Sequence, residues 1–439
     1  MKPVLAPLAL ILAATAAQAQ TMTERLDPDQ AVLAAADCLH DWTMKPFDQL
    51  ASDCVDIAFS DNLYLRELFA WVVFARVTEL IPDSDGPGMN DTGQAPLWMS
   101  WATDPETFDP APQDGKNTLA AFNFDAREPR NQMRPSTEEK DFARMTLSEE
   151  EPTHISTEDP DGANEEVNRN QIAYDYLIAN GLTTKAGVAT FFETHDTVEM
   201  PVGSIELKAS WLQVTDGSPA PEGALTFPFQ GGTYWWRGLH IMMKMRPLDH
   251  SSPYDIFYSE DPSWFWSTFE FNNNPGTQHV RDALITQRAP LDPALIERLL
   301  TDMKSEGFGF ENLAPNGTQI RFTVDGRGEP VILGHTNMED FAGKWNTAQP
   351  YNWVAFEASC HGCHATASYR PNPEFKRNPA IKNPCKDDWE KAPVFFPFSV
   401  PVGKLHPGYN MQDACSEVAY LGQGFMPLDF MWPIAFQTK

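Results

Sequence analysis

Basic side chains are scarce in this chain. Its 439 residues include 32 Lys and Arg against 61 Asp and Glu, which gives a formal net charge of −29 at pH 7. Because a negative field repels phosphate groups, nucleic acid and anionic lipid surfaces are excluded as partners. A partner protein with a basic docking surface remains compatible with this charge.

Long apolar runs are also missing beyond the N-terminus. The longest later candidate, Phe69–Ala75, is far too short to span a bilayer. At the N-terminus, Lys2 precedes an apolar stretch, and Ala17-Gln18-Ala19 matches the small-x-small rule for signal cleavage. We therefore expect residues 1–19 to be a signal peptide and the mature protein to be periplasmic or secreted, with no membrane span.

Cysteine is rare, with six in the whole chain. An oxidising compartment favours disulfides over cysteine-rich zinc sites. Pairing nearest neighbours predicts one disulfide between Cys38 and Cys54 and another between Cys385 and Cys415, although six cysteines also permit other pairings. Two cysteines then remain for another use.

Those two cysteines belong to the run Cys360-His361-Gly362-Cys363-His364, which has the C-x-x-C-H form of covalent haem attachment. A helical turn places residues three apart on one face, so two thiols can reach two vinyl groups on one porphyrin edge. The following histidine then gives the iron a proximal imidazole. The motif predicts one covalently bound haem c.

Three other structures use the same C-x-x-C spacing. A thioredoxin-like dithiol requires a surrounding βαβ unit, whereas Pro-rich irregular sequence follows the motif here. A zinc site completed by Cys385 and Cys415 fits the spacing but not the compartment. A disulfide within the motif would be strained. Haem attachment is therefore the interpretation we favour.

The sixth iron ligand is open on the sequence. Met426 is the first candidate, because Met426-Pro427 resembles the Met-Pro step that small mono-haem cytochromes c place several dozen residues after the motif. A histidine or an open position is the alternative, and methionines often only fill cores. The other candidate ligands are Met411, Met431, His406, His240 and His335. Arg370, shortly after the motif, is a candidate partner for a haem propionate, because a guanidinium forks onto a carboxylate.

The patterning predicts an α+β fold: a helical N-terminal part, a β-rich central lobe and a C-terminal haem-binding segment packed on it. We expect a mainly helical region with acidic loops over 20–195, the β-rich lobe over 196–340 and the haem attachment segment over 341–439. Predicted helices are a stripe from Leu65 to Val73 opened by Asn62, a second over 164–180 capped by Asn164, and a third opened by Asp292-Pro293. Predicted strands cover 204–211, 233–237, 239–245, 264–271, 319–324 and 330–334.

Five groups of segments, in order along the chain, resemble a family of exported bacterial mono-haem c-type cytochrome proteins. In that family the Phe-Glu step is followed by His and later by Asp-Asn, whereas Phe271, Asn273 and Asn274 stand here. The resemblance implies an exported c-type haem protein with His240 and Glu270 near the haem, and it supplies no substrate. The matching segments are Leu68–Trp71; Glu166–Asn168 with Asp175-Tyr176 and Asn180–Leu182; Ile205–Trp211; Gly238–Ile241; and Trp266–Glu270.

Three functions follow from a single haem in an acidic protein. The first is electron transfer with a periplasmic redox partner, which the acidic charge would steer. The second is a haem-dependent oxidoreductase that acts on peroxide, oxygen or a small molecule at an open iron site. The third is a redox subunit of a larger periplasmic complex. Electron transfer is our leading hypothesis.

Overall fold

The computed structural model describes the residue ranges 35–83, 87–108, 163–229, 231–248, 262–272, 289–305, 307–320, 333–335, 338, 360, 364, 367–369, 426–431 and 433–434. The predicted signal peptide lies outside these ranges. So do Cys363, Arg370, Cys385 and Cys415.

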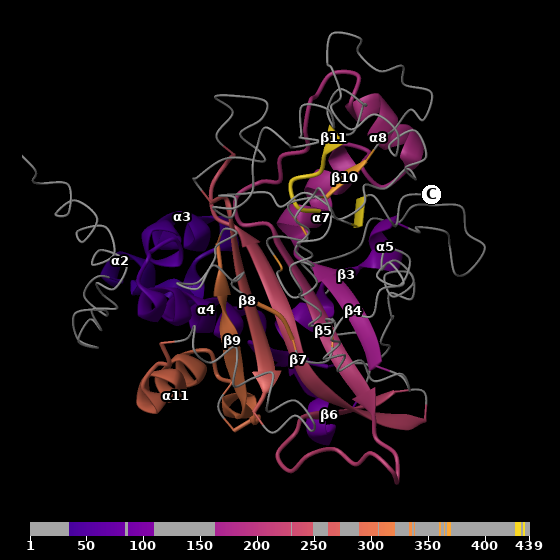
Figure 1. Ribbon diagram of the computed structural model, residues 1–439. Coiled ribbons are helices and arrows are strands. Elements are labelled where there is room, and N and C mark those ends of the chain that lie inside the picture. The colour runs from indigo at the N-terminus through magenta and orange to yellow at the C-terminus, as the bar shows by residue number, and fades with distance from the viewer. Residues whose placement is uncertain are drawn as a thin grey trace, which may run out of the picture.

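A seven-stranded antiparallel sheet forms the centre of the molecule (Figure 1). Its order is β3-β4-β5-β7-β8-β9, with β6 paired to β7. Two small sheets, β1-β2 and β10-β11, lie apart from it. The strands are β1 Leu80–Pro82, β2 Gln94–Pro96, β3 Ala102–Thr103, β4 Ala163–Arg169, β5 Ile205–Gln213, β6 Thr226–Phe229, β7 Gly232–Lys244, β8 Trp264–Phe271, β9 Leu313–Gln319, β10 Ser368–Tyr369 and β11 Met426–Pro427.

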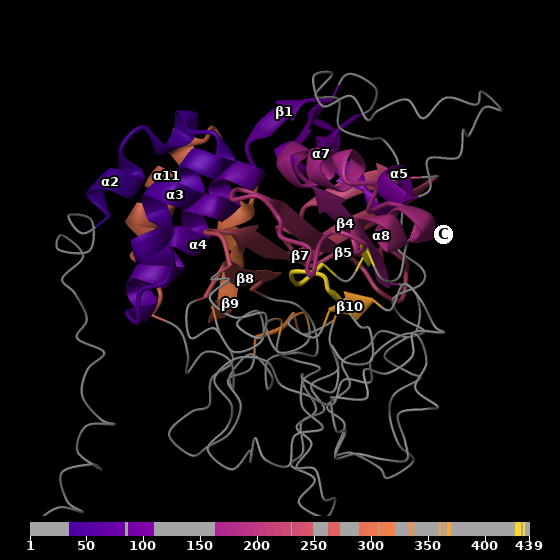
Figure 2. The same cartoon turned by 90° about the horizontal axis from the view of Figure 1, so that it is seen from above.

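α3, α4 and α11 gather together and pack on one face of the sheet (Figure 2), whereas α7 and α8 lie near the ends of the strands with β10 and β11, and α5 lies beside β3 and β4 (Figure 1). The α-helices are α2 Ala36–Leu39, α3 Phe47–Ala58, α4 Leu63–Val77, α5 Asp104–Phe108, α7 Gln171–Ala179, α8 Lys185–Phe191 and α11 Pro293–Asp302. The 3-10 helices are η1 Trp42–Met44, η2 Met89–Asp91, η3 Leu97–Ser100 and η5 Phe310–Asn312.

Alternation along the strands divides the core in two, because successive side chains point to opposite faces. On β8, Phe265 and Phe269 pack with α3, α4 and α11 in what we call the helical-side core. Trp264 and Trp266 point the other way, into the C-terminal-side core, which also contains Phe430 and parts of α5, α7 and α8. The aromatic run of β8 is therefore buried on both faces of the sheet.

Local signals in the sequence identified several elements correctly. The side chain of Asn62 accepts from the backbone N–H groups of Tyr64 and Leu65 and begins α4. Asp292 caps α11 in the same way, with Pro293 at its first position. The two runs predicted as separate strands over 233–245 form one strand, β7, with a bulge opposite Ser210 and Trp211.

The helix expected over 164–180 is wrong in its first half. Residues from Ala163 to Arg169 form β4, and the helix α7 begins only after Asn170, whose side chain accepts from the N–H of Ala173. Seven residues of β4 pair with β5, and this pairing outweighs the local capping signal at Asn164. A strand was also predicted to begin at Gln319, whereas in the structure Gln319 is the last residue of strand β9.

The α+β prediction is confirmed, with a helical N-terminal part and a sheet-rich centre. Strand β4, from the region expected to be mainly helical, pairs with β5 of the central lobe. Residues from both sequence regions therefore share one sheet. No helix in the described ranges combines the length and apolar character needed to cross a membrane.

Candidate functional site

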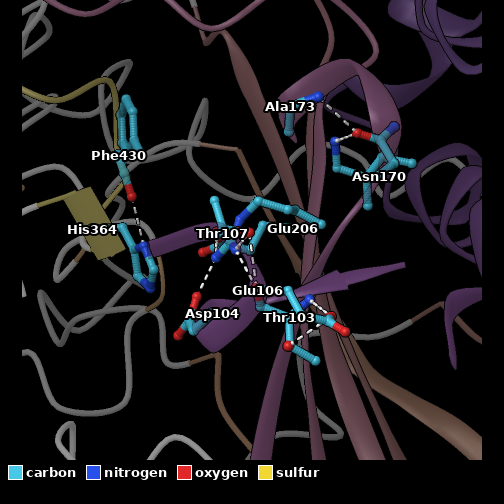
Figure 3. Close-up of polar contacts among 11 residues, drawn as sticks. Thr103, Asp104, Glu106, Thr107, Asn170, Ala173, Glu206, His364 and Phe430 are labelled. Carbon is cyan, nitrogen blue, oxygen red and sulfur yellow. Dashed lines mark hydrogen bonds and ion pairs between the residues drawn. The ribbon is translucent and has the colours of Figure 1, made fainter. Parts of the chain in front are cut away.

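His364 lies on the face of the sheet that carries the C-terminal-side core. Its ring centroid is 4.8 Å from that of Trp266 on β8, with the planes tilted by 56°. Its Nδ1 atom is 2.8 Å from the backbone carbonyl oxygen of Phe430 (Figure 3). A strand of the sheet and a C-terminal turn thus hold the imidazole from two sides.

The hydrogen bond to Phe430 fixes the tautomer of His364. A carbonyl oxygen can only accept, so the proton must be on Nδ1. In the neutral ring the lone pair is then on Nε2, the atom that binds a metal when Nδ1–H donates to a backbone carbonyl. The imidazole has the protonation and anchoring that a proximal iron ligand requires.

Cys360 is half-buried against the same core. Both Cys360 and His364 have helical backbone conformation. The Sγ atom of Cys360 is 3.4 Å from the carbonyl oxygen of Leu333, which also packs in the C-terminal-side core. The structure therefore brings a thiol and a correctly protonated imidazole to one apolar face.

The turn that carries the Phe430 carbonyl is attached to the sheet by Asp429. Its carboxylate accepts from Nζ of Lys244 at 2.9 and 2.7 Å, from Nε1 of Trp264 at 2.8 Å and from the N–H of Met200 at 2.7 Å. Burial lowers the pKa of Lys244, and the Asp429 carboxylate acts in the opposite direction. The ion pair is fully enclosed, since Lys244 is 0% and Asp429 1% exposed.

The candidate methionine ligands lie in this C-terminal segment. Met426 is half-buried in β11 and pairs with Tyr369 of β10, five residues beyond His364. Met431 is fully buried in the C-terminal-side core. The pairing of β10 with β11 brings the Met-Pro step beside the segment that follows the attachment motif. Met411 and His406 lie outside the described residues.

The histidine candidates from the central lobe lie close to each other. His240 on β7 is opposite Thr268 on β8, with Nδ1 2.7 Å from the threonine hydroxyl. Its ring centroid is 6.1 Å from that of His335. His240 lies two residues from Met242 on β7, and Thr268 lies two residues from Trp266 on β8. Because side chains two residues apart on a strand point to the same face, His240 and Thr268 are on the face that carries His364. Buried Glu270 accepts from Nδ2 of Asn316 at 2.6 Å on this face.

A second buried charge cluster on this face was not foreseen from the sequence. The guanidinium of Arg169 is fully buried and forms ion pairs with Asp104 and Glu206 (Figure 3). Burial acts to lower the pKa of Arg169, but the two carboxylates outweigh it and the net shift is upward. Arg169 falls within the helix predicted over 164–180, so no signal for this cluster was available from the sequence.

The predicted N-terminal disulfide is present between Cys38 and Cys54 and links α2 to α3. In the described part of the chain, no group of three or more His, Cys, Asp or Glu side chains is placed to bind a metal ion. Comparison with protein-family models, with curated proteins and with solved structures finds no match for this chain.

Proposed function

We propose that the protein is an exported, periplasmic c-type cytochrome that carries one haem c on Cys360 and Cys363 and acts in electron transfer. The observation that carries the proposal is the hydrogen bond from Nδ1 of His364 to the Phe430 carbonyl, because it leaves the lone pair on Nε2. Any histidine that faces a carbonyl oxygen adopts this tautomer, so its significance here comes from the place of His364 in the motif. In a C-x-x-C-H motif, this tautomer is the one that ligates iron.

The residues around His364 suit a porphyrin. Trp266 and Phe430 supply aromatic surface, with ring centroids 6.1 Å apart, and Cys360 packs against the same core. A haem requires such an apolar wall beside its attachment thiols. When bound, the haem would supply a one-electron redox centre. Arg370, our candidate for a propionate contact, follows the motif by six residues.

The charge of the chain favours a specific kind of redox partner. A formal net charge of −29 attracts a basic docking surface and speeds the encounter. Because the Debye length falls from about 10 Å at 0.1 M salt to about 3 Å at 1 M, the association rate falls as salt is added. The periplasmic partner in this proposal is therefore a protein with a basic surface.

A second function, that of a haem-dependent oxidoreductase, is favoured by one observation. His240, Thr268 and Glu270 place polar groups on the same sheet face as Trp266, where a simple carrier needs only apolar surface. Such groups donate and accept protons in peroxide or oxygen chemistry. Binding of carbon monoxide to the reduced protein discriminates the two functions, since a carrier with a firmly held sixth ligand does not bind it.

The test of haem attachment is the intact mass of the exported protein. The wild-type chain should carry the added mass of one haem, and the C360S/C363S double variant should not. The matched control is C38S/C54S, which removes the disulfide between Cys38 and Cys54 and should keep the haem. A wild-type chain without the added mass contradicts the proposal.

A further inference from the structure

We infer that Asp429, held by Lys244, is a positioning residue for the proximal imidazole: it fixes the turn whose Phe430 carbonyl orients His364, and thereby sets the reduction potential of the haem. This inference rests on the proposed function and goes beyond it. No C-x-x-C-H motif specifies which carbonyl serves His364 or what holds that carbonyl.

The turn at Asp429 and Phe430 has an unfavourable backbone conformation. Asp429 has φ 47° and Phe430 has φ 69°, so two consecutive residues other than glycine lie in the left-handed region. A bulky residue such as Phe is rare there, and such conformations persist only where their surroundings enforce them. Something must therefore hold the turn in place.

The side chain of Asp429 supplies that restraint. Four hydrogen bonds converge on its carboxylate: two from Lys244 on β7, one from Trp264 on β8 and one from the backbone of Met200, in the segment before β5. The next residue presents its carbonyl to His364 at 2.8 Å. The residue that is held in place, Asp429, is therefore directly adjacent to Phe430, which accepts the hydrogen bond from the imidazole.

Stability alone does not account for a fully buried ion pair. Desolvation of the two charges offsets most of their attraction, and apolar pairs of similar volume are often as stable. The four hydrogen bonds to the Asp429 carboxylate do fix the position of the turn. Partners that orient a ligating histidine raise its basicity, which favours the oxidised metal. Loosening the turn should therefore raise the reduction potential.

The experiment compares the haem-loaded D429N variant with wild type by potentiometric titration and by the NMR resonance of the His364 Nδ1–H. We expect an upward shift of about 59 mV, a tenfold change in the one-electron equilibrium, with exchange broadening of the Nδ1–H signal. The control is E165Q, which removes a lysine-bound carboxylate on the same sheet: Glu165 binds Lys208 at 2.9 Å. Its potential and Nδ1–H signal should match wild type.

If D429N does not fold, W264F replaces it, because it removes one of the four hydrogen bonds and keeps the ion pair. A smaller upward shift is expected from W264F. An unchanged potential and Nδ1–H signal in whichever haem-loaded variant folds, even with lowered stability, overturns the inference and leaves the pair a structural element. Absence of haem from the wild-type chain would instead refute the proposed function, so the two failures are distinguishable.

Discussion

The imidazole of His364 and the carbonyl of Phe430 are joined by a hydrogen bond across 66 residues of sequence. The bond connects the C-x-x-C-H motif to a turn that is itself bound to the central sheet through Asp429. His364 is therefore oriented by the tertiary structure and not only by the helix of its own motif. Its contact with Trp266 has the same consequence.

The sixth ligand can be identified by spectroscopy of two methionine variants. If Met426 ligates the iron, M426A loses the methionine-to-iron charge-transfer band of the oxidised protein and gains carbon monoxide binding when reduced. M411A is the control and should keep the band. If both variants keep the band, another methionine ligates the iron and Met431 becomes the variant to test. If the wild type lacks the band, His240 and His335 become the candidates.

Replacing Arg169 should be strongly destabilising. R169M leaves Asp104 and Glu206 buried without their shared cation. Breaking a buried ion pair from one side costs about 3–5 kcal/mol, which urea unfolding would measure as a lower midpoint. H40Q is the control: His40 and Asp41 form an exposed contact, with side chains 78% and 76% exposed, so its loss should cost no more than about 1 kcal/mol. Equal effects of the two variants would contradict the assignment.

Removing the disulfide between Cys38 and Cys54 should lower the stability of the α2–α3 region. A bond that closes a loop of this length, with a sequence separation of 16, is worth about 3 kcal/mol by loss of chain entropy in the unfolded state. Urea unfolding of C38S/C54S would measure the loss. Dithiothreitol should lower the unfolding midpoint of wild type toward that of the variant, and an insensitive wild type would argue against the bond.

A side chain at Gly238 should disrupt the contact between β7 and β8. Gly238 has φ +150°, and an added Cβ would collide with the carbonyl oxygen of Phe269 and lie 2.9 Å from Cα of Glu270. G238A should therefore cost more than about 2 kcal/mol in thermal or urea unfolding. At Gly217 an added Cβ meets nothing within 4 Å, so G217A should change stability by less than about 0.5 kcal/mol.

Tyr176 should make stability decline at alkaline pH. Burial is the main cause that raises its pKa above 10.0, with Asp429 and Glu199 acting in the same direction and the hydrogen bond from the N–H of Glu199 against them. Because the unfolded chain then loses the phenolic proton first, this contribution to stability is complete below pH 10 and falls as pH rises beyond it. Urea midpoints at several alkaline pH values should fall less steeply for Y176F than for wild type.

Local sequence signals were sufficient wherever an element is decided by its own residues. The caps at Asn62 and Asp292 and the aromatic-rich run of β8 each encode their structure directly. Local signals failed at Asn164, which resembles a helix cap but lies in strand β4. Pairing of β4 with β5 decided that this segment forms a strand. Tertiary pairing of this kind has no signature in a short window.

The candidate site also combines features that are visible in the local sequence with features that depend on tertiary structure. Cys360 and His364 are readable from spacing alone, since the chemistry dictates the motif. The acceptor at Phe430 is a backbone carbonyl, which every residue possesses, so no side-chain pattern marks it. Lys244 offered a usable signal, because a lysine in an otherwise buried strand requires a counter-charge. Nothing in the sequence indicates that this counter-charge lies 185 residues away.

The place of β11 and the turn after it near the C-terminus has a consequence for biosynthesis. A ribosome completes His364 before it makes residue 430, so the imidazole emerges before the carbonyl that accepts from it. Late truncations that remove the turn at Asp429 and Phe430 should therefore spare any covalent loading of the motif while leaving the imidazole unsupported.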